Sequence, residues 1–221
     1  CQRLAAGAQR HQARILEHCE VRSALSNDEG SVTLSTSLGD LVADRYVVAT
    51  GADSLATQTL AGVTIPQRST PGVIVMTKPL PRLIHRLIAA PGIHLHQRDD
   101  GKLVIGEQSG APDNIAHTMR LRERPTHFPT ETTALAHAER MLAITRHYLP
   151  AAAAAEVDEV LIGWRPLPID GHPVIGTPGA SPASYLAIMH SGITLAPIVG
   201  QLVAQELLTR TPSPHLSNYR P

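Results

Sequence analysis

The residues best suited to chemistry lie in the last third of the chain. Arg165 stands between Trp164 and Pro166 at the end of an extended segment, and its planar guanidinium suits a carboxylate bound through two parallel hydrogen bonds. Further on, Ser191 and Gly192 separate a short apolar run from an apolar helix-forming segment. The first N–H groups of a helix have no partner within it and favour an anion. The pattern predicts a site where an arginine and a helix N-terminus each face an anionic group.

Both features also have an ordinary interpretation. An arginine beside a proline is often a surface residue paired with a nearby carboxylate. The segment from Ser191 to Thr194 also fits a plain strand-to-helix loop in which one of these two hydroxyl residues caps the helix. The sequence alone leaves these alternatives open.

A third feature is the end of an apolar run at Thr50, Gly51 and Ala52. A nucleotide can lie across a strand end of this kind in α/β proteins. The chain contains no G-x-G-x-x-G segment, so the usual pyrophosphate-binding turn is missing from it.

Other arrangements of reactive residues are incomplete. His94 and His96 share one face of a predicted strand, but no third ligand accompanies them, so no metal site is expected. His190-Ser191-Gly192 is not a nucleophile elbow, because Met189 and Ile193 occupy the positions where that turn requires glycine.

Composition excludes several function classes. The chain has 221 residues with 19 Lys+Arg and 19 Asp+Glu, so its charge gives no broad attraction for nucleic acid or an anionic membrane. We expect no transmembrane segment and no secretory leader. Cys1 and Cys19 lack the spacing of a disulfide framework or a metal site, Cys19 is expected to be a small buried hydrophobe, and a cytoplasmic location is the default. Because the chain starts at Cys1 without Met, we expect it to be a piece of a longer protein.

Hydrophobic periodicity places the elements that must position these residues. We expect a first helix in residues 3–17, an extended stretch in 19–23 and a half-buried strand in 31–37 with Val32 and Leu34 on one face. A second strand is predicted over 41–50, and its residues 46–49 are apolar enough to be covered on both faces.

The middle of the chain has a different sequence pattern, with short β-forming runs separated by turn residues. Residues 73–77 are strongly β-prone, and Asp99-Asp100-Gly101-Lys102 predicts a hairpin between strands 93–97 and 103–106. Thr130 is a candidate cap for a helix that runs to about Leu149, with Leu135, Ala138, Leu142, Thr145 and Leu149 along one side.

The last part returns to strand and helix. Residues 157–164 and 185–189 are predicted strands, and residues 193–208 form an amphipathic helix with Pro197 in its first turn. The inward positions of that helix are Leu195, Val199, Leu202, Val203 and Leu207. This order favours the α/β (α+β) class, with two domains interleaved along one chain.

The motifs together resemble a known family. Gly163-Trp164-Arg165-Pro166, the segment 170–176 (Asp-Gly-His-Pro-Val-Ile-Gly) and the segment 189–197 (Met-His-Ser-Gly-Ile-Thr-Leu-Ala-Pro) resemble the C-terminal half of FAD-dependent amino-acid and amine oxidoreductases. That family includes D-amino acid oxidase, glycine oxidase and sarcosine oxidase. Residues 47–54 are similar to its central FAD-domain strand. The resemblance implies an incomplete Rossmann-like FAD-binding domain (1–64 and 166–221) interleaved with an antiparallel-sheet substrate domain (65–165).

The resemblance also implies roles for particular residues. Arg165 would hold the substrate carboxylate. The cofactor-binding residues that it implies are Val21, Thr50, Gly51, Ala52, His190, Gly192, Ile193, Thr194 and Leu195. Of these, residues 192–195 would offer backbone N–H groups to the pyrimidine edge of a non-covalently bound flavin, and Val21 would contact the adenine end through its backbone. Without the N-terminal dinucleotide segment, we expect this chain alone to bind FAD weakly or not at all.

The implied reaction is oxidation of a small amino acid or secondary amine, such as glycine, an N-alkyl glycine or a D-amino acid. Hydride passes from the carbon that bears the amine to the flavin, and water then hydrolyses the imine to an oxo acid. One alternative is a non-catalytic, truncated flavoprotein subunit that packs against a partner, in a homo- or hetero-oligomer. Another is an NAD-linked dehydrogenase, which the missing glycine motif disfavours.

Overall fold

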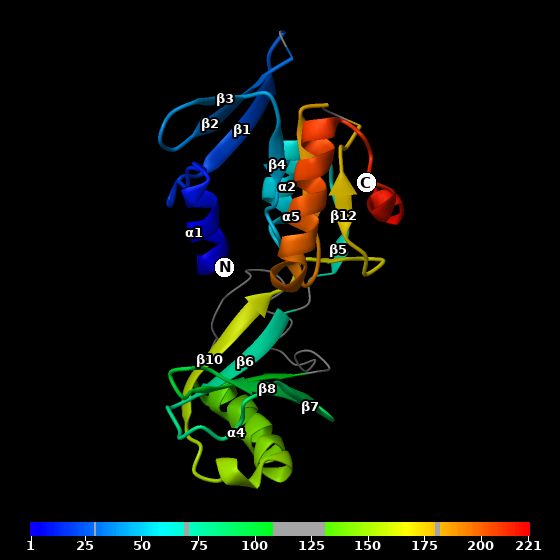
Figure 1. The fold of residues 1–221 in the computed structure, drawn as a ribbon. Helices are drawn as coiled ribbons and strands as arrows, with labels where there is room; N and C mark the ends of the chain where they lie inside the picture. The colour runs from blue at the N-terminus through cyan, green and yellow to red at the C-terminus, as the bar shows by residue number, and fades with distance from the viewer. Residues whose placement is uncertain (29, 69–70, 108–130, 180–181) are drawn as a thin grey trace. The chain divides into compact units, whose positions relative to one another are not determined.

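The computed structural model describes residues 1–28, 30–68, 71–107, 131–179 and 182–221. It contains two compact units (Figure 1): Cys1–Arg68 together with Pro166–Pro221, and Ser69–Arg165. We call them the first unit and the second unit. The chain therefore begins in the first unit, passes into the second and returns to the first.

The central sheet of the first unit has the strand order β12-β13-β4. Its strands are β12 (Val174–Gly176), β13 (Ser184–Ile188) and β4 (Tyr46–Val48). β13 runs parallel to β4, with Leu186 opposite Val48, and antiparallel to β12. This parallel pair is the α/β part of the predicted fold.

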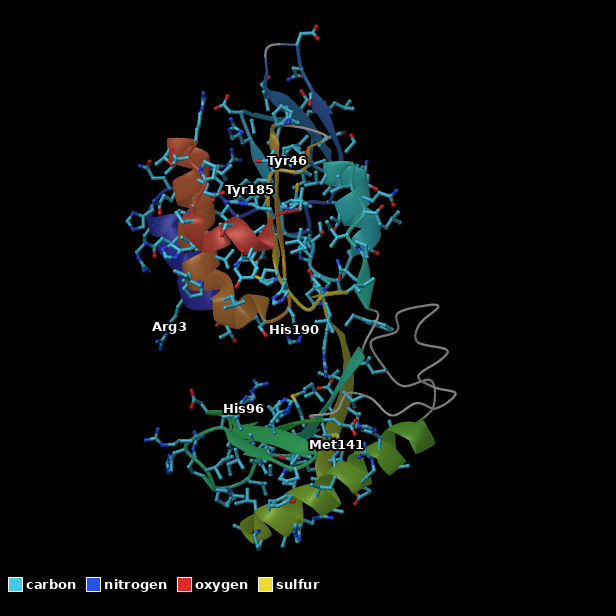
Figure 2. All side chains as sticks on the ribbon, turned by 90° about the vertical axis from the view of Figure 1, so that its right-hand side faces the viewer. Arg3, Tyr46, His96, Met141, Tyr185 and His190 are labelled. Atoms are coloured by element: carbon cyan, nitrogen blue, oxygen red, sulfur yellow. The ribbon has the colours of Figure 1, made fainter. Side chains whose placement is uncertain are left out.

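One helix covers each face of that sheet. On one face, Tyr185 and Met189 pack with Val199 and Val203 of α5 (Gly192–Thr209). On the other face, Leu186 and Val48 pack with Ala61 of α2 (Ser54–Ala61). Successive residues of a strand point to opposite faces, so Tyr185 and Leu186 contact different helices. Figure 2 shows α2 and α5 on opposite sides of the sheet.

The predicted inward face of α5 is confirmed. Val199 and Val203 are buried, and Leu195, Leu202 and Leu207 pack against the same cluster. The helix begins at Gly192, one residue earlier than predicted, which places Pro197 in the second turn rather than the first. A proline at that position removes the N–H that would have bonded to the carbonyl of Ile193.

The remaining elements of the first unit are short. α1 (Gln2–Arg10) precedes a three-stranded antiparallel sheet, β1-β2-β3, and β5 (Gln67–Arg68) pairs with β11 (Leu167–Pro168). The strands of the three-stranded sheet are β1 (Val21–Ser26), β2 (Val32–Thr36) and β3 (Leu41–Ala43). The 3-10 helix η2 (Pro214–Tyr219) follows α5, and its Leu216 is buried in the α5 cluster.

Several N-terminal predictions are wrong. The first helix ends at Arg10 instead of residue 17, and Gln12 and His18 adopt positive φ angles of 67° and 55°, which no helix tolerates. Cys19 is half-buried rather than buried.

The predicted strand 41–50 is two strands, because the chain leaves the β2 partner after Ala43 and joins β13 at Tyr46. Its residues 46–49 are also not covered on both faces. Val48 is 2% exposed, but Val47, which points to the opposite face, is 43% exposed.

The second unit is built on a five-stranded antiparallel sheet with the order β10-β6-β9-β8-β7. Its strands are β10 (Val157–Trp164), β6 (Pro71–Thr77), β9 (Leu103–Glu107), β8 (Ile93–Gln97) and β7 (Ile88–Ala90). The predicted hairpin is confirmed, with Leu95 opposite Ile105. The predicted strand 157–164 is found with the same bounds.

α4 (Glu131–Tyr148) packs on one face of this sheet and is followed by the 3-10 helix η1 (Pro150–Ala152). Ala138, Met141 and Leu142 of α4 are fully buried against Leu95 and Ile105. Leu135 was predicted to point inward but is 46% exposed. Met141, which was not among the predicted inward residues, is fully buried in the core. The predicted cap Thr130 lies outside the described residues.

Candidate functional site

The first candidate site lies at the carboxyl edge of the parallel pair β4 and β13. Because the two strands run in the same direction, the turns that follow them lie at the same edge of the sheet. Thr50, Gly51 and Ala52 follow β4 and lead into α2, while His190 and Ser191 follow β13 and lead into α5. The structure therefore brings together the two segments that were predicted to bind a cofactor. In open α/β sheets this edge is where ligands bind.

The N-terminus of α5 has no side-chain cap. Ser191 occupies the cap position with a left-handed backbone (φ 58°), and its Oγ contacts Nδ1 of His190 at 2.8 Å instead of an N–H group of the helix. The N–H group of Leu195 donates to the carbonyl of Ser191 at 3.0 Å. Within the described part of the chain, the N–H groups of Gly192, Ile193 and Thr194 have no hydrogen-bond acceptor.

The side-chain cap that the ordinary interpretation of this loop predicted is not formed. Neither Ser191 nor Thr194 caps the helix, so three donors and the positive end of the helix dipole remain available to a ligand. Leu195, the fourth predicted donor, already has its partner inside the helix. Ile193 is 80% exposed, so its backbone is not shielded by the core.

The turn after β4 is fixed by side-chain contacts. Oδ1 of Asp53 accepts a hydrogen bond from the N–H of Ala56 at 2.9 Å and caps α2. Thr50 Oγ1 and Thr57 Oγ1 lie 2.6 Å apart, and Thr57 is fully buried. Gly51 has φ 62°, a conformation that favours glycine. The turn is therefore held rigidly beside the N-terminus of α5.

Val21 is placed in another sheet of the first unit. It opens β1 and is 37% exposed. Its backbone contact with a cofactor stays a prediction.

Arg165 belongs to the second unit and follows β10 directly. Its guanidinium lies against Gly72 of β6. A Cβ atom added at Gly72 would stand 2.8 Å from both Nε and Nη2 of Arg165, which is too close for a real contact. That Arg165 and the N-terminus of α5 face each other stays a prediction, because they belong to different units.

A second glycine was missed by sequence reasoning. A Cβ atom added at Gly106 of β9 would overlap the imidazole ring of His94 on β8, which faces Gly106 across the two strands. The pKa of His94 is lowered by burial first, and then by the charges of Arg165 and His96. A glycine inside a strand was the available signal, since it often marks a close approach of another group.

His94 and His96 do lie on one face of β8, as predicted. Figure 2 shows His96 on the side of the sheet away from α4, which carries Met141. Among the described residues, no group of three His, Cys, Asp or Glu side chains is placed to hold a metal ion.

One described helix, α5, is long and apolar enough to cross a membrane by length and composition alone, with a mean hydropathy of 1.2. One side of this helix packs on the core cluster of the first unit. A single helix of this kind is weak evidence for a membrane span.

The fold defines a class: a chain with one α/β unit and one antiparallel-sheet unit. The family model for FAD dependent oxidoreductases (DAO) matches residues 1–206, and the chain belongs to this family. FAD dependence is a property of the family. The predicted α/β (α+β) fold class is confirmed by the structural matches below.

The chain is similar to several curated proteins. It is 27% identical to one of the subunits of opine oxidase from Agrobacterium tumefaciens (strain Ach5) over 178 residues, which cover 80% of this chain and 43% of that protein. It is 27% identical to glycine oxidase of Pseudomonas aeruginosa over 207 residues, which cover 93% of this chain and 53% of that protein. The chain thus spans about half the length of these relatives or less.

Solved structures show the same fold. Glycine oxidase from Geobacillus kaustophilus matches 98% of this chain with a TM-score of 0.71 at 22% identity, and this chain covers 55% of it. L-proline dehydrogenase from P. horikoshii matches 95% of this chain with a TM-score of 0.74 at 23% identity, and 54% of it is covered.

Proposed function

We propose that this chain forms the substrate-binding part and the C-terminal cofactor-binding part of an enzyme that oxidises a small amino acid or secondary amine with FAD. Glycine, an N-alkyl glycine or a D-amino acid is the expected type of substrate. Membership of the FAD dependent oxidoreductase family supports the proposal, as do relatives whose names are those of a glycine oxidase and an opine oxidase. The observation that carries it is the uncapped N-terminus of α5 at the carboxyl edge of β4 and β13.

The residues at this edge fit a flavin. Bound FAD supplies a ring that accepts the hydride and gathers negative charge at its pyrimidine edge. The three N–H groups of residues 192–194 are donors fixed in place before any charge develops, and such donors cost no reorganisation during the reaction. Thr50, Gly51 and Ala52 would line the cofactor path at the same edge, with His190 beside them.

Arg165 has the role of holding the substrate carboxylate. Its guanidinium is a planar fork that binds a carboxylate through two hydrogen bonds, and this contact fixes where the α-carbon lies. We propose non-covalent binding of FAD, because the two cysteines, Cys1 and Cys19, both precede β1 and lie outside the segments assigned to the flavin. The imine would leave the site or be hydrolysed by water, so no protein base is required once the amine is neutral.

The proposal is tested by loading the enzyme with FAD and measuring flavin absorbance and amine oxidation. Arg165→Ala should raise the Michaelis constant for glycine or N-methylglycine at least tenfold, since a charged hydrogen-bonded contact is lost. Flavin absorbance should stay unchanged. Arg86→Ala, an exposed arginine of the same unit, is the matched control. Unchanged kinetics in Arg165→Ala would remove Arg165 from the site.

A second candidate is a non-catalytic flavoprotein subunit that packs against a partner. The opine oxidase relative is named as one subunit of its enzyme, which supports an assembly with other chains, and we propose a homo- or hetero-oligomer in the cytoplasm. Tight FAD binding without oxidation of any amino acid or amine, in the isolated protein and in its complex, would favour this candidate. Binding of NAD instead of FAD would favour a nicotinamide-linked dehydrogenase.

A further inference from the structure

The first unit contains a cavity of about 330 Å³ at the amino edge of its central sheet, opposite to the edge proposed to bind the flavin. Arg45 directly precedes β4, and Tyr185 is the second residue of β13. Thr177 follows β12, which is antiparallel to β13, and Arg210 follows the C-terminus of α5. The 18 residues of α5 separate this edge from the helix N-terminus by about 27 Å.

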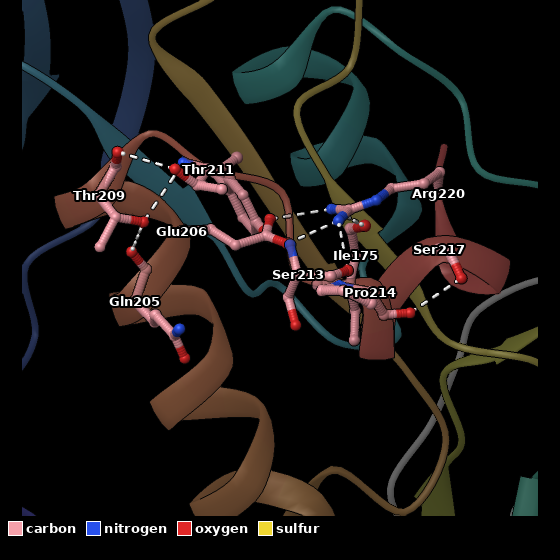
Figure 3. A network of polar contacts seen from close by, with 10 residues as sticks. Ile175, Gln205, Glu206, Thr209, Thr211, Ser213, Pro214, Ser217 and Arg220 are labelled. Carbon is pink, nitrogen blue, oxygen red and sulfur yellow. Dashed lines mark hydrogen bonds and ion pairs between the residues drawn. The ribbon is translucent and has the colours of Figure 1, made fainter.

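The lining of this cavity carries an excess of positive charge. Its charged side chains are those of three arginines, Arg45, Arg210 and Arg220, and of Glu206. The guanidinium of Arg220 donates to both carboxylate oxygens of Glu206, so these two charges balance each other (Figure 3). Two positive charges therefore remain unbalanced on the lining, those of Arg45 and Arg210.

Both of these arginines have donors to spare. Nη1 of Arg45 donates to the carbonyl of Pro182 at 2.8 Å, which anchors the side chain and leaves most of its N–H groups free. Among the described residues, neither Arg45 nor Arg210 forms an ion pair. The cavity thus has two guanidinium groups that can bind an anion without breaking a contact within the described part of the chain.

Each arginine also has an ordinary structural role. A cation beside a helix C-terminus offsets the negative end of the helix dipole, and Arg210 directly follows α5. The hydrogen bond from Arg45 ties the start of β4 to the loop before β13. Neither role explains why the two arginines line one cavity in which the only carboxylate among the described lining residues, that of Glu206, is already paired.

We propose that this cavity binds a small phosphate monoester through Arg45 and Arg210. A phosphate monoester carries a charge of about −1.5 to −2 at neutral pH, which matches the two unbalanced arginines. Its three terminal oxygens point in different directions, so two guanidinium groups can bind it from different sides. A carboxylate, in contrast, is planar and suits a single guanidinium fork.

The rest of the lining suits the organic part of such a ligand. Thr177 is exposed on the lining and adds a hydroxyl donor, whereas Leu207 and Pro212 add apolar surface. Small-molecule sites have volumes of about 300–1,000 Å³, so this cavity is at the lower end of the range. It therefore has room for a phosphate group with a small organic substituent.

The pH dependence of binding should come from the ligand, because the lining does not titrate near neutral pH. The hydrogen bonds from Arg220, the largest favourable cause, lower the pKa of Glu206 to about 2, and burial first of all raises the pKa of Tyr185 to about 12. The second ionisation of a phosphate monoester has a pKa of about 6. Affinity should therefore rise between pH 5 and pH 7.5, as the ligand gains its second negative charge.

The experiment is a calorimetric titration with phenyl phosphate and phenyl sulfate, with and without saturating FAD. Phenyl sulfate has a similar shape but a single negative charge at both pH values. At pH 7.5 we expect phenyl phosphate to bind at least about tenfold more tightly than phenyl sulfate, as for one more hydrogen bond between charged groups. The difference should shrink at pH 5, and FAD should not displace phenyl phosphate.

Two variants separate ligand binding from a structural role of the arginines. Arg45→Gln and Arg210→Gln should each weaken binding of phenyl phosphate about tenfold, with unchanged flavin absorbance. Arg14→Gln, at an exposed arginine of the same unit outside the cavity, is the matched control and should keep the affinity. Thermal melting shows that each variant is folded. The rise in melting temperature caused by phenyl phosphate should be lost in the two cavity variants alone.

Three results would overturn this inference. One is the absence of measurable binding at millimolar phenyl phosphate. Another is unchanged affinity in Arg45→Gln and Arg210→Gln, with only their melting temperatures lowered, because the arginines would then be purely structural. The third is displacement of phenyl phosphate by FAD, which would place the anion in the cofactor site. None of these results depends on whether the protein oxidises an amine, so the inference and the proposed function can fail separately.

Discussion

The carboxylate of Glu206 accepts two hydrogen bonds from the guanidinium of Arg220, at 2.6 and 2.9 Å (Figure 3). Glu206 belongs to α5, and Arg220 directly follows η2. The hydroxyl of Tyr185 and the backbone N–H of Ser213 donate to the same carboxylate. Because Glu206 is 8% exposed, these four hydrogen bonds satisfy a buried charge. They join α5, β13 and the C-terminal segment.

This contact predicts acid sensitivity of the first unit. The hydrogen bonds from Arg220, the largest favourable cause, lower the pKa of Glu206 from 4.5 to about 2. A lowered folded-state pKa means that its stabilisation is complete above pH 4.5 and is lost as pH falls towards 2. The shift corresponds to about 3 kcal/mol of unfolding free energy at neutral pH. Urea unfolding between pH 6 and pH 2 measures this loss.

Glu206→Gln should lower stability at pH 7 and flatten its pH dependence below pH 4.5. Glu156→Gln is the control, because Glu156 pairs with Lys78 in an exposed ion pair whose removal changes little. An equally steep acid transition in Glu206→Gln would show that other carboxyl groups cause it.

The core of the second unit gives a prediction of stability alone. Met141 is fully buried among Leu95, Ile105 and Leu142, between α4 and the sheet. Met141→Ala should lower the unfolding free energy by about 2–5 kcal/mol, from lost burial and the cavity left behind. Leu87→Ala, at a residue of the same unit that is 64% exposed, should change it by about 0.5 kcal/mol or less. Chemical denaturation compares the two. Similar losses would contradict the assignment of this core.

Periodicity in the sequence predicted those helices and strands whose local sequence carries a strong pattern of its own. β10 and the hairpin of β8 and β9 have strong β-forming runs with clear turn residues, and α5 has a continuous apolar stripe. The break between β3 and β4 was not predictable in this way. Neither of the two residues between them, Asp44 and Arg45, is a glycine or a proline. The strand is interrupted there because β3 pairs with β2, whereas β4 pairs with β13.

The candidate site was predictable only in part. The position of the N-terminus of α5 follows from the Ser191-Gly192 pair, but only the structure shows that the Ser191 hydroxyl contacts His190 and does not cap the helix. The roles of Gly72 and Gly106 depend on side chains that reach over them from neighbouring strands. A glycine inside a strand indicates that another group comes close, but it does not identify that group, because the partners are distant in the sequence.

Gly72 offers a test of how Arg165 is positioned. Gly72→Ala adds a Cβ atom 2.8 Å from Nε and Nη2 of Arg165, so the guanidinium must move. We expect a several-fold rise in the Michaelis constant for the amino-acid substrate with little change in melting temperature, because the side chain is flexible. Gly163→Ala is the matched control. Gly163 faces Gly72 across the strands, and an added Cβ atom there meets nothing within 4 Å. Equal effects of both variants would contradict a role for the contact with Arg165.

A substitution at the N-terminus of α5 should raise the stability of the first unit and lower the affinity for FAD. Ile193→Glu places a carboxylate in a first turn that holds no acidic residue, at a position that is 80% exposed. The helix dipole should then stabilise the first unit by about 0.3–1 kcal/mol. The same charge should repel the electron-rich edge of the reduced flavin, lowering both FAD affinity and the flavin reduction potential. Leu208→Glu, at the other end of α5 and 85% exposed, should change neither flavin property. Thermal melting, FAD titration and potentiometry measure these effects, and a rise in FAD affinity in Ile193→Glu would place the flavin elsewhere.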